Sequence, residues 1–151
     1  MMYDPPAIAD FLENAKEWLD VPYHHQGKIR AGADCAGWII GCAAEVGINL
    51  DYLDVPNRPR IADGEKLLAR VQEYCEPYER SLGALLLFKV DKFPHHFGIH
   101  IGWERDYEFM LHSCNSQRKV VKTAINNNQD WGGSKLLGCY KLPGFDYSMI
   151  K

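Results

Sequence analysis

Residues 32–40 of this chain read Gly-Ala-Asp-Cys-Ala-Gly-Trp-Ile-Ile, a turn of small residues that leads into an apolar run. Asp34 is a good N-cap, because its carboxylate can accept the unpaired amide hydrogens of a first helical turn. The apolar side chains that follow recur at steps of three and four residues, and Gly47 provides a stop (Trp38, Ile39, Cys42, Ala43 and Val46). The stretch therefore predicts a buried helix with Cys35 in its first turn.

The setting of Cys35 allows two interpretations. Unpaired backbone amides and the positive end of the helix dipole favour a thiolate, which would make Cys35 a nucleophile. Alternatively, Cys35 is a small core residue, the usual role of a free cysteine. The other four cysteines lie in or beside apolar stretches and are expected to fill space (Cys42, Cys75, Cys114 and Cys139). The total of five cysteines is odd and includes no Cys-x-x-Cys pair, which argues against a disulfide framework and favours a reducing compartment.

Composition and length predict one globular domain over residues 1–151, with 46% hydrophobic and 25% charged residues. The net charge of -3 argues against nucleic-acid binding, which needs a basic surface. No apolar run is long enough for membrane insertion. The first residues lack the basic and apolar regions of a signal peptide, so we expect synthesis in the cytoplasm.

The periodicity of the chain predicts helices first and strands second. A helix is expected over residues 6–19, with Asp4 as its cap, and another from Asp63 to about residue 74. Runs of strand length follow, and the first of them is apolar throughout, as in a strand buried on both faces (residues 85–88, 97–101, 108–112, 119–123 and 136–142). This order predicts an α+β fold, in which N-terminal helices pack on a central antiparallel sheet of about five to six strands.

The hairpin between the second and third of these strands brings two histidines together. A three-residue turn, Trp103-Glu104-Arg105, would pair Gly102 with Asp106, because loop length fixes the register of a hairpin. His96 would then lie directly opposite His112, at a Cβ separation of about 4.5–5.5 Å. The same register places other residues in opposed pairs (His100 with Glu108, and Gly98 with Met110).

A contact between two imidazoles suits a nucleophilic mechanism. One histidine would act as the base toward Cys35, and the other would fix its orientation and tautomer. His100 would share a sheet face with His96 and is expected to be a surface residue or a substrate contact. A zinc site formed by Cys35, His96 and His112 is an alternative, because these are suitable ligands for tetrahedral zinc, although no pair has the spacing of a zinc motif.

In the same order along the chain, these segments resemble the motifs of the NlpC/p60 cell-wall cysteine peptidases. That family has a Pro-Tyr loop, an Asp-Cys-Ser-Gly nucleophile turn, a buried strand, a His-Val-Gly-Ile-Tyr-x-Gly strand and a second histidine. The corresponding segments of this chain are Pro22-Tyr23, Asp34-Cys35-Ala36-Gly37, residues 85–88, residues 96–102 and His112. The loop from Pro22 to Gln26 resembles the branch found in tail-associated wall peptidases of phages and prophages.

The resemblance implies a papain-like fold with Cys35 as nucleophile, His96 as base and His112 as orienting residue. It implies substrate contacts near Cys35 by Tyr23 and Asp34. Ala36 replaces the usual serine and so lacks a hydroxyl that would help to bind a substrate amino group. His100 replaces a common tyrosine, and both departures affect the choice of substrate.

The implied reaction is hydrolysis of amide bonds in the stem peptides of bacterial peptidoglycan, through a thioester on Cys35. It needs no metal or other cofactor. The phage-like loop further implies phage tail proteins as partners and incorporation in a virion. Two alternatives to an enzyme stay open at this point, a non-catalytic tail or assembly module of the same fold and a zinc-binding protein.

Overall fold

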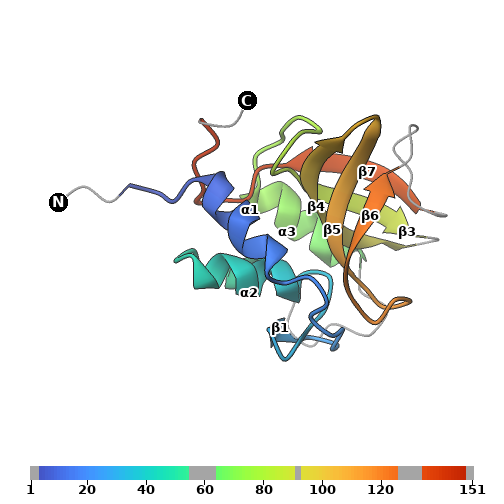
Figure 1. Ribbon diagram of the computed structural model, residues 1–151. Helices are drawn as coiled ribbons and strands as arrows, with labels where there is room; N and C mark the ends of the chain where they lie inside the picture. Colours follow the sequence, from blue (N-terminus) through green and yellow to red (C-terminus); the bar gives the residue numbers. More distant parts are fainter. Residues whose placement is uncertain (1–3, 55–63, 91–92, 126–133, 149–151) are drawn as a thin grey trace.

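The helices precede the sheet along the chain in the computed structural model, which describes residues 4–54, 64–90, 93–125 and 134–148 (Figure 1). The helices are α1 (Ile8–Lys16), α2 (Gly37–Glu45) and α3 (Gly64–Tyr74), with a short 3-10 helix at Asp51–Leu53. The strands are β1 (Lys28–Ile29), β2 (Gly32–Ala33), β3 (Leu85–Val90), β4 (Phe93–Glu104), β5 (Tyr107–Cys114), β6 (Lys119–Ile125) and β7 (Ser134–Tyr140). The predicted α+β class is confirmed.

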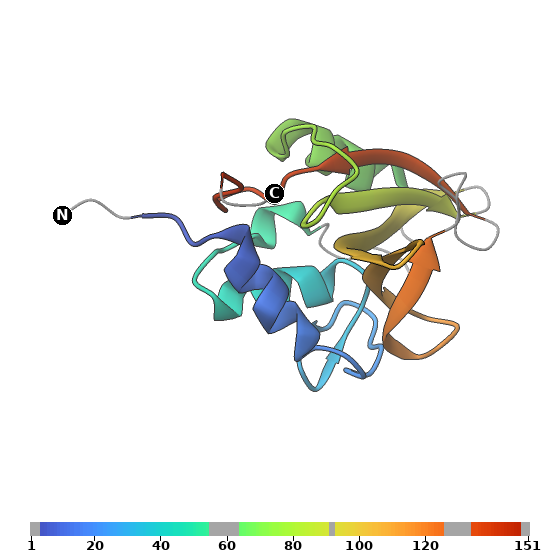
Figure 2. The same ribbon diagram turned by 45° about the horizontal axis from the view of Figure 1, so that its top comes forward.

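Strands β3 to β7 form one five-stranded sheet in the order β6-β5-β4-β3-β7, and every neighbouring pair is antiparallel. Strands β1 and β2 form a separate small hairpin, which the sequence did not predict. Figures 1 and 2 show α1 and α2 packed together beside the sheet, with α3 lying against it. None of the helices in the described ranges is long and apolar enough to cross a membrane.

Both faces of strand β3 are buried, which explains its continuous apolar run. Leu85 and Leu87 lie in the main core, which the sheet shares with the helices. Leu86 and Phe88 lie in a smaller core on the opposite face, with Met110 of β5. Because side chains alternate along a strand, a strand buried on both faces carries apolar residues at every position.

Helix α1 is shorter than predicted. Its N-cap position is Ala7, which makes no side-chain cap, so the predicted capping by Asp4 is wrong. The amide of Ile8 instead donates to the carbonyl of Asp146 at 2.9 Å, so a contact with the C-terminal segment fixes the start of the helix. At the other end, Asp20 has a φ of 70°, and its amide donates to Val120.

Helix α2 confirms the prediction made for it. It runs from Gly37 to Glu45, and four of the five predicted inward-facing residues are buried (Trp38, Ile39, Cys42 and Ala43). The fifth, Val46, is the half-buried C-cap, and Gly47 follows it with a φ of 94°. In α3, Leu67 and Val71 are buried and Leu68 is half-buried. The predicted capping residue of α3, Asp63, lies outside the described residues.

The predicted register of the β4–β5 hairpin is wrong. Glu104 pairs with Tyr107, so the turn has two residues, Arg105 and Asp106, and Arg105 takes a φ of 58°. A two-residue hairpin turn needs a residue with positive φ, which is usually glycine or asparagine. Arginine gives no such signal in the sequence. Farther along the hairpin, His100 pairs with Met110 and not with Glu108.

A β-bulge in β4 places His96 and His112 on the same face of the sheet, as the histidine prediction requires. The register shifts between His100 and Gly102, where Gly102 has a φ of 99° that glycine adopts without a steric penalty. Beyond the bulge, the register differs from the predicted one by two residues, and a shift of two keeps each side chain on its face. His96 and His112 therefore still share a face, as diagonal neighbours.

Candidate functional site

The Cys35 turn (residues 32–37) is held by the carboxylate of Asp34. One oxygen accepts the amide of Gly37 at 2.8 Å, and the other accepts the amide of Gln26 at 2.8 Å. The carbonyl of Asp34 accepts the amide of Trp38 at 3.1 Å, so helical hydrogen bonding begins at Asp34. Cys35 thus lies in the turn directly before α2, whose N-cap position is Ala36, and not inside the first helical turn as predicted.

These bonds correct the predicted role of Asp34. Its side chain is 2% exposed, and both carboxylate oxygens accept bonds from the chain around Cys35. A buried carboxylate needs such donors, because removing it from water without them is costly. Asp34 therefore shapes the turn and does not line an open cleft.

Gly37, the last residue of the Asp-Cys-Ala-Gly motif, must be glycine for a steric reason. A Cβ on Gly37 would lie 1.7 Å from the carbonyl oxygen of Gly27. One helical turn later, a Cβ on Gly41 would lie 2.1 Å from the carbonyl oxygen of Lys28. Helix α2 thus packs backbone to backbone against the segment that precedes the Cys35 turn, and only glycine permits that approach.

Among the five free cysteines, Cys35 has the setting of a nucleophile. It is partly exposed at the start of α2, whereas Cys42, Cys75 and Cys114 are buried. Burial raises the pKa of Cys42 and of Cys75 to about 12, so both stay thiols at neutral pH. Burial also raises the pKa of Cys139.

The two predicted histidines are in contact. Nε2 of His96 lies 2.7 Å from Nδ1 of His112, and the ring planes are at 90°. The other nitrogen of His112, Nε2, lies 2.8 Å from Oγ1 of Thr123 on β6. Burial lowers the pKa of His112 to about 4, so its ring is neutral at pH 7. The predicted His96–His112 contact is confirmed.

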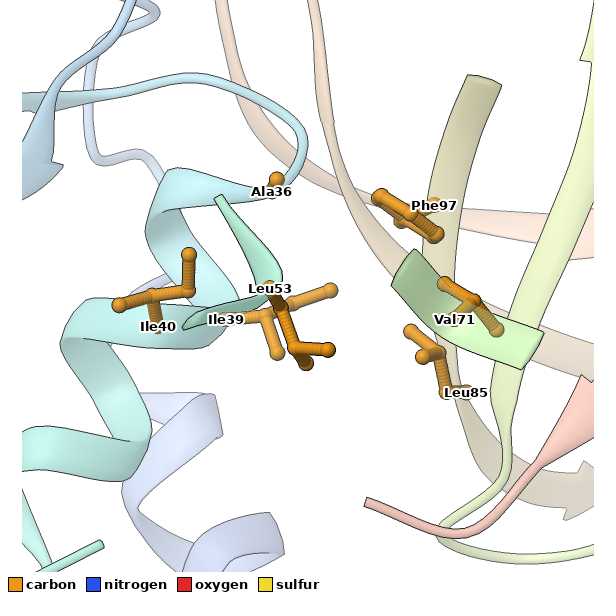
Figure 3. A pocket seen from close by; sticks show the side chains of 7 residues that line it. All are labelled: Ala36, Ile39, Ile40, Leu53, Val71, Leu85 and Phe97. Atoms are coloured by element: carbon orange, nitrogen blue, oxygen red, sulfur yellow. The ribbon is translucent and has the colours of Figure 1, made fainter. Parts of the chain in front are cut away.

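Two features bring the Cys35 turn to the histidine strands. The hydroxyl of Ser113, next to His112, donates to the carbonyl of Ala33 at 2.8 Å. On the other side of the turn, Ala36 and Phe97 line one small apolar cavity, shown in Figure 3. The chain neighbours of these two residues are Cys35 and His96. The chain segments that carry Cys35 and His96 are therefore adjacent in the fold.

The cavity itself is too small for a substrate group. Its free volume is about 10 Å³, and its described lining is almost entirely apolar (Ala36, Ile39, Ile40, Leu53, Val71, Leu85 and Phe97). That volume is about one water-sized sphere. Ala36 is therefore a buried residue of the cavity wall.

His100 is not where the sequence analysis expected it. It is fully buried, its Nδ1 accepts the amide of Gly102 at 3.0 Å, and its Nε2 lies 2.6 Å from the carboxylate of Glu108. Arg80 binds the same carboxylate through two nitrogens. Both ring nitrogens of His100 are engaged, so the predictions of a surface position and of a substrate contact are wrong.

Tyr23 lies in the loop beside the Cys35 turn. Its amide donates to the carbonyl of Arg118 at 2.9 Å. The flanking residues Pro22 and His24 both form backbone hydrogen bonds with Ala33. Tyr23 is partly exposed. Its predicted contact with substrate stays a prediction.

The zinc alternative receives no support from the residues that the structure describes. Within them, there is no group of three or more His, Cys, Asp or Glu side chains that could hold a metal ion. The facing nitrogens of His96 and His112 bond to each other, and Thr123 occupies the remaining nitrogen of His112.

Sequence reasoning missed two of the residues that build this region, Ser113 and Thr123. Ser113 directly follows a predicted site residue, but a serine next to a histidine carries no signal of its own. Thr123 is the one threonine of the chain and ends a predicted strand. Its contact with His112 follows from the β5–β6 register, in which Met110 pairs with Thr123 and His112 with Val121.

A larger groove lies on the face of the sheet that the helices cover. It runs between α1 and the β4–β5 hairpin, has a volume of about 770 Å³, and includes the exposed residues Leu19 and Trp103. Leu111 also lines it, and adjacent residues of a strand point to opposite faces. The groove is therefore separate from the His96–His112 pair.

A cysteine at the start of a helix, joined to an antiparallel sheet that carries paired histidines, defines a papain-like α+β protein of the cysteine-hydrolase class. The sequence model of the NlpC/P60 family matches residues 20–136, and the chain belongs to this family. Its members are cysteine peptidases that hydrolyse peptidoglycan.

Solved structures show the same fold. The chain is similar to the NlpC/p60 domain of the peptidoglycan hydrolase SagA, with a TM-score of 0.56 and 16% identity over 89% of this chain and 98% of that one. It is also similar to an NlpC/P60 family protein from Bacillus cereus, with a TM-score of 0.59 and 23% identity over 87% of this chain and 40% of the other. No curated protein sequence matched the chain.

Proposed function

We propose that this protein cleaves amide bonds in the stem peptides of bacterial peptidoglycan, with Cys35 as nucleophile, His96 as base and His112 as the residue that orients His96. The observation that carries the proposal is the 2.7 Å contact between His96 and His112, on strands tied to the Cys35 turn. Family membership supplies the class of reaction.

The proposed reaction is acyl transfer to water. His96 takes the thiol proton of Cys35, and the thiolate sulfur attacks the peptide carbonyl carbon. His96 then donates that proton to the leaving amine as the C–N bond breaks, which leaves a thioester. A water molecule, deprotonated by His96, attacks the thioester, and the carboxylic acid leaves as the Cys35 thiol is restored.

The backbone of the Cys35 turn limits which groups can stabilise the oxyanion. Such donors must point at the position where negative charge develops. The amides of Gly37 and Trp38 already donate to Asp34. We therefore assign the oxyanion contact to the backbone amides of Cys35 and Ala36, next to the positive end of the α2 dipole.

The test is digestion of purified peptidoglycan with wild type, Cys35→Ala and the control Cys139→Ala, followed by mass spectrometry of the released fragments. We expect wild type and Cys139→Ala to produce new amino termini, and Cys35→Ala to produce none. The masses identify the bond. Cleavage by Cys35→Ala would exclude the mechanism, and no cleavage of several wall types by wild type would favour a non-catalytic module.

We also propose association with a phage tail, with tail proteins as partners and a place in the virion. The support is the similarity of the loop from Pro22 to Gln26 to that of phage-type wall peptidases. Mass spectrometry of purified particles from the producing strain tests this. Peptides of this chain at a constant ratio to tail proteins are expected, and their absence from particles would contradict the proposal.

A further inference from the structure

His112 and Thr123 form a hydrogen bond, and the chemistry of the two groups limits which of them is the donor. A neutral imidazole has one N–H donor and one nitrogen acceptor, whereas a hydroxyl can do both. His112 is neutral, and its two nitrogens face His96 and Thr123. The ring therefore donates to one of these neighbours and accepts from the other, which leaves two arrangements.

In the first arrangement, Nε2–H of His112 donates to Oγ1 of Thr123, and Nδ1 accepts the Nε2–H of His96. The lone pair on Nδ1 of His96 is then available for the thiol proton of Cys35. In the second arrangement, the Thr123 hydroxyl donates to His112, and His112 donates to Nε2 of His96. His96 then carries its proton on Nδ1 and has its lone pair occupied, so it cannot act as a base.

We propose that Thr123 is a positioning residue, whose hydroxyl oxygen accepts the Nε2–H of His112 and so selects the tautomer in which His96 is a base. The inference rests on the proposed roles of Cys35, His96 and His112. Thr123 is partly exposed, so its own hydroxyl proton can go to water while its oxygen accepts. The arrangement also suits the protonated intermediate, because an imidazolium at His96 still donates through Nε2.

Burial of His112 makes the acceptor important. Its ring is fully buried, and a buried N–H without an acceptor is costly. Without Oγ1, the proton of His112 is better placed on Nδ1, where it faces His96. Thr123→Val keeps the shape of the side chain and removes the oxygen, so it tests this tautomer preference.

Three measurements test the proposal. The first is nitrogen-15 NMR of the histidine rings in wild type, where His112 is expected to carry its proton on Nε2. A proton on Nδ1 would overturn the proposal without any variant. The second is the rate of Cys35 alkylation by iodoacetamide against pH, followed on the Cys35 peptide because the chain has five cysteines.

The third is the rate of peptidoglycan cleavage. For Thr123→Val, we expect kcat to fall by about 10- to 100-fold, the size of effect seen for partners that orient metal-bound histidines, with little change in KM. The pH at which the rate of Cys35 alkylation begins to rise should also be higher in Thr123→Val than in wild type. Thr123→Ser keeps the oxygen and should restore both profiles.

Val121→Ala is the matched control. Val121 lies opposite His112 on the same strand as Thr123 and offers no hydrogen bond. It should change packing but leave the tautomer of His112 and the alkylation profile as in wild type. If Thr123→Val also left both unchanged, the proposal would be wrong.

The readouts separate the two proposals. Tautomer and alkylation results as expected, with no cleavage of peptidoglycan by wild type, would remove the proposed function and keep the role of Thr123. Cleavage by wild type, with equal kcat and pH profile for Thr123→Val, would keep the function and remove that role.

Discussion

The hydroxyl of Ser113 donates a hydrogen bond to the carbonyl of Ala33 at 2.8 Å, although 80 residues separate the two in the sequence. Ala33 lies two residues before Cys35, and Ser113 directly follows His112. This buried bond thus joins the segment that carries the thiol to the strand that carries the orienting histidine.

Ser113→Ala should weaken this junction. The carbonyl of Ala33 keeps a longer bond from the amide of His24, at 3.3 Å, so we expect a loss of about 1 kcal/mol in the free energy of unfolding. Peptidoglycan cleavage should fall more than stability does, because the turn shifts relative to His96. Urea unfolding and cleavage rates measure both. Ser116→Ala, in the exposed turn after β5, is the control, and an equal effect there would contradict the prediction.

Gly37→Ala should disrupt the start of α2. The added methyl would overlap the backbone oxygen of Gly27, at 1.7 Å, and backbone cannot move aside cheaply. We expect a destabilisation of about 3 kcal/mol or more, as for severe overpacking, with loss of activity.

Gly98→Ala provides the comparison for stability. There the methyl would meet the sulfur of Met110, at 2.6 Å, which is the end of a flexible side chain. Thermal unfolding of both variants should show a clearly smaller loss for Gly98→Ala. The reverse order would contradict the packing argument.

Cys35→Ala should leave stability nearly unchanged while it removes activity. Cys35 is partly exposed, and the substitution removes a single sulfur atom, so little buried contact is lost. The midpoint of thermal unfolding, compared with wild type, checks this. A loss of several degrees would indicate that Cys35 is a core residue, the alternative that the sequence left open.

His112 should make stability depend on pH. Its folded pKa is about 4, below the ordinary value of 6.5, so between these values the unfolded chain binds a proton that the folded chain does not. Stability should therefore rise as pH increases from about 4 to 6.5, with a contribution of about 3 kcal/mol from this residue.

His112→Asn removes this contribution. Urea unfolding at several pH values should show a shallower rise for His112→Asn than for wild type over the same range. His100 is present in both proteins, so its own titration cancels in the comparison. Parallel curves for the two proteins would contradict the assigned cause.

The sequence was sufficient for the three α-helices, the five strands of the main sheet and the histidine contact, but not for the small β1–β2 hairpin or the register. Apolar periodicity identified α2 and the five strands of the main sheet, because burial decides those patterns. The turn at Arg105 and Asp106 escaped prediction, because a left-handed arginine has no sequence signature. The predicted contact survived because the bulge before Gly102 returned His96 and His112 to one face.

Roles that depend on contacts between distant segments were less predictable. Asp34 was expected both as a cap and as a substrate contact, and only burial distinguishes the two. His100 aligned with a family position but forms a buried pair with Glu108. Thr123 and Ser113 form hydrogen bonds with residues on other strands or loops. No local sequence pattern predicts such contacts.

The order of elements along the chain has a consequence for synthesis. A ribosome releases the N-terminal segment with Cys35 well before strands β4, β5 and β6, which carry His96, His112 and Thr123. On the proposed mechanism, the nascent thiol has no base until the sheet has paired around it. A translation product that stops before β5 is therefore unable to cleave amide bonds by this mechanism, although it already contains the thiol.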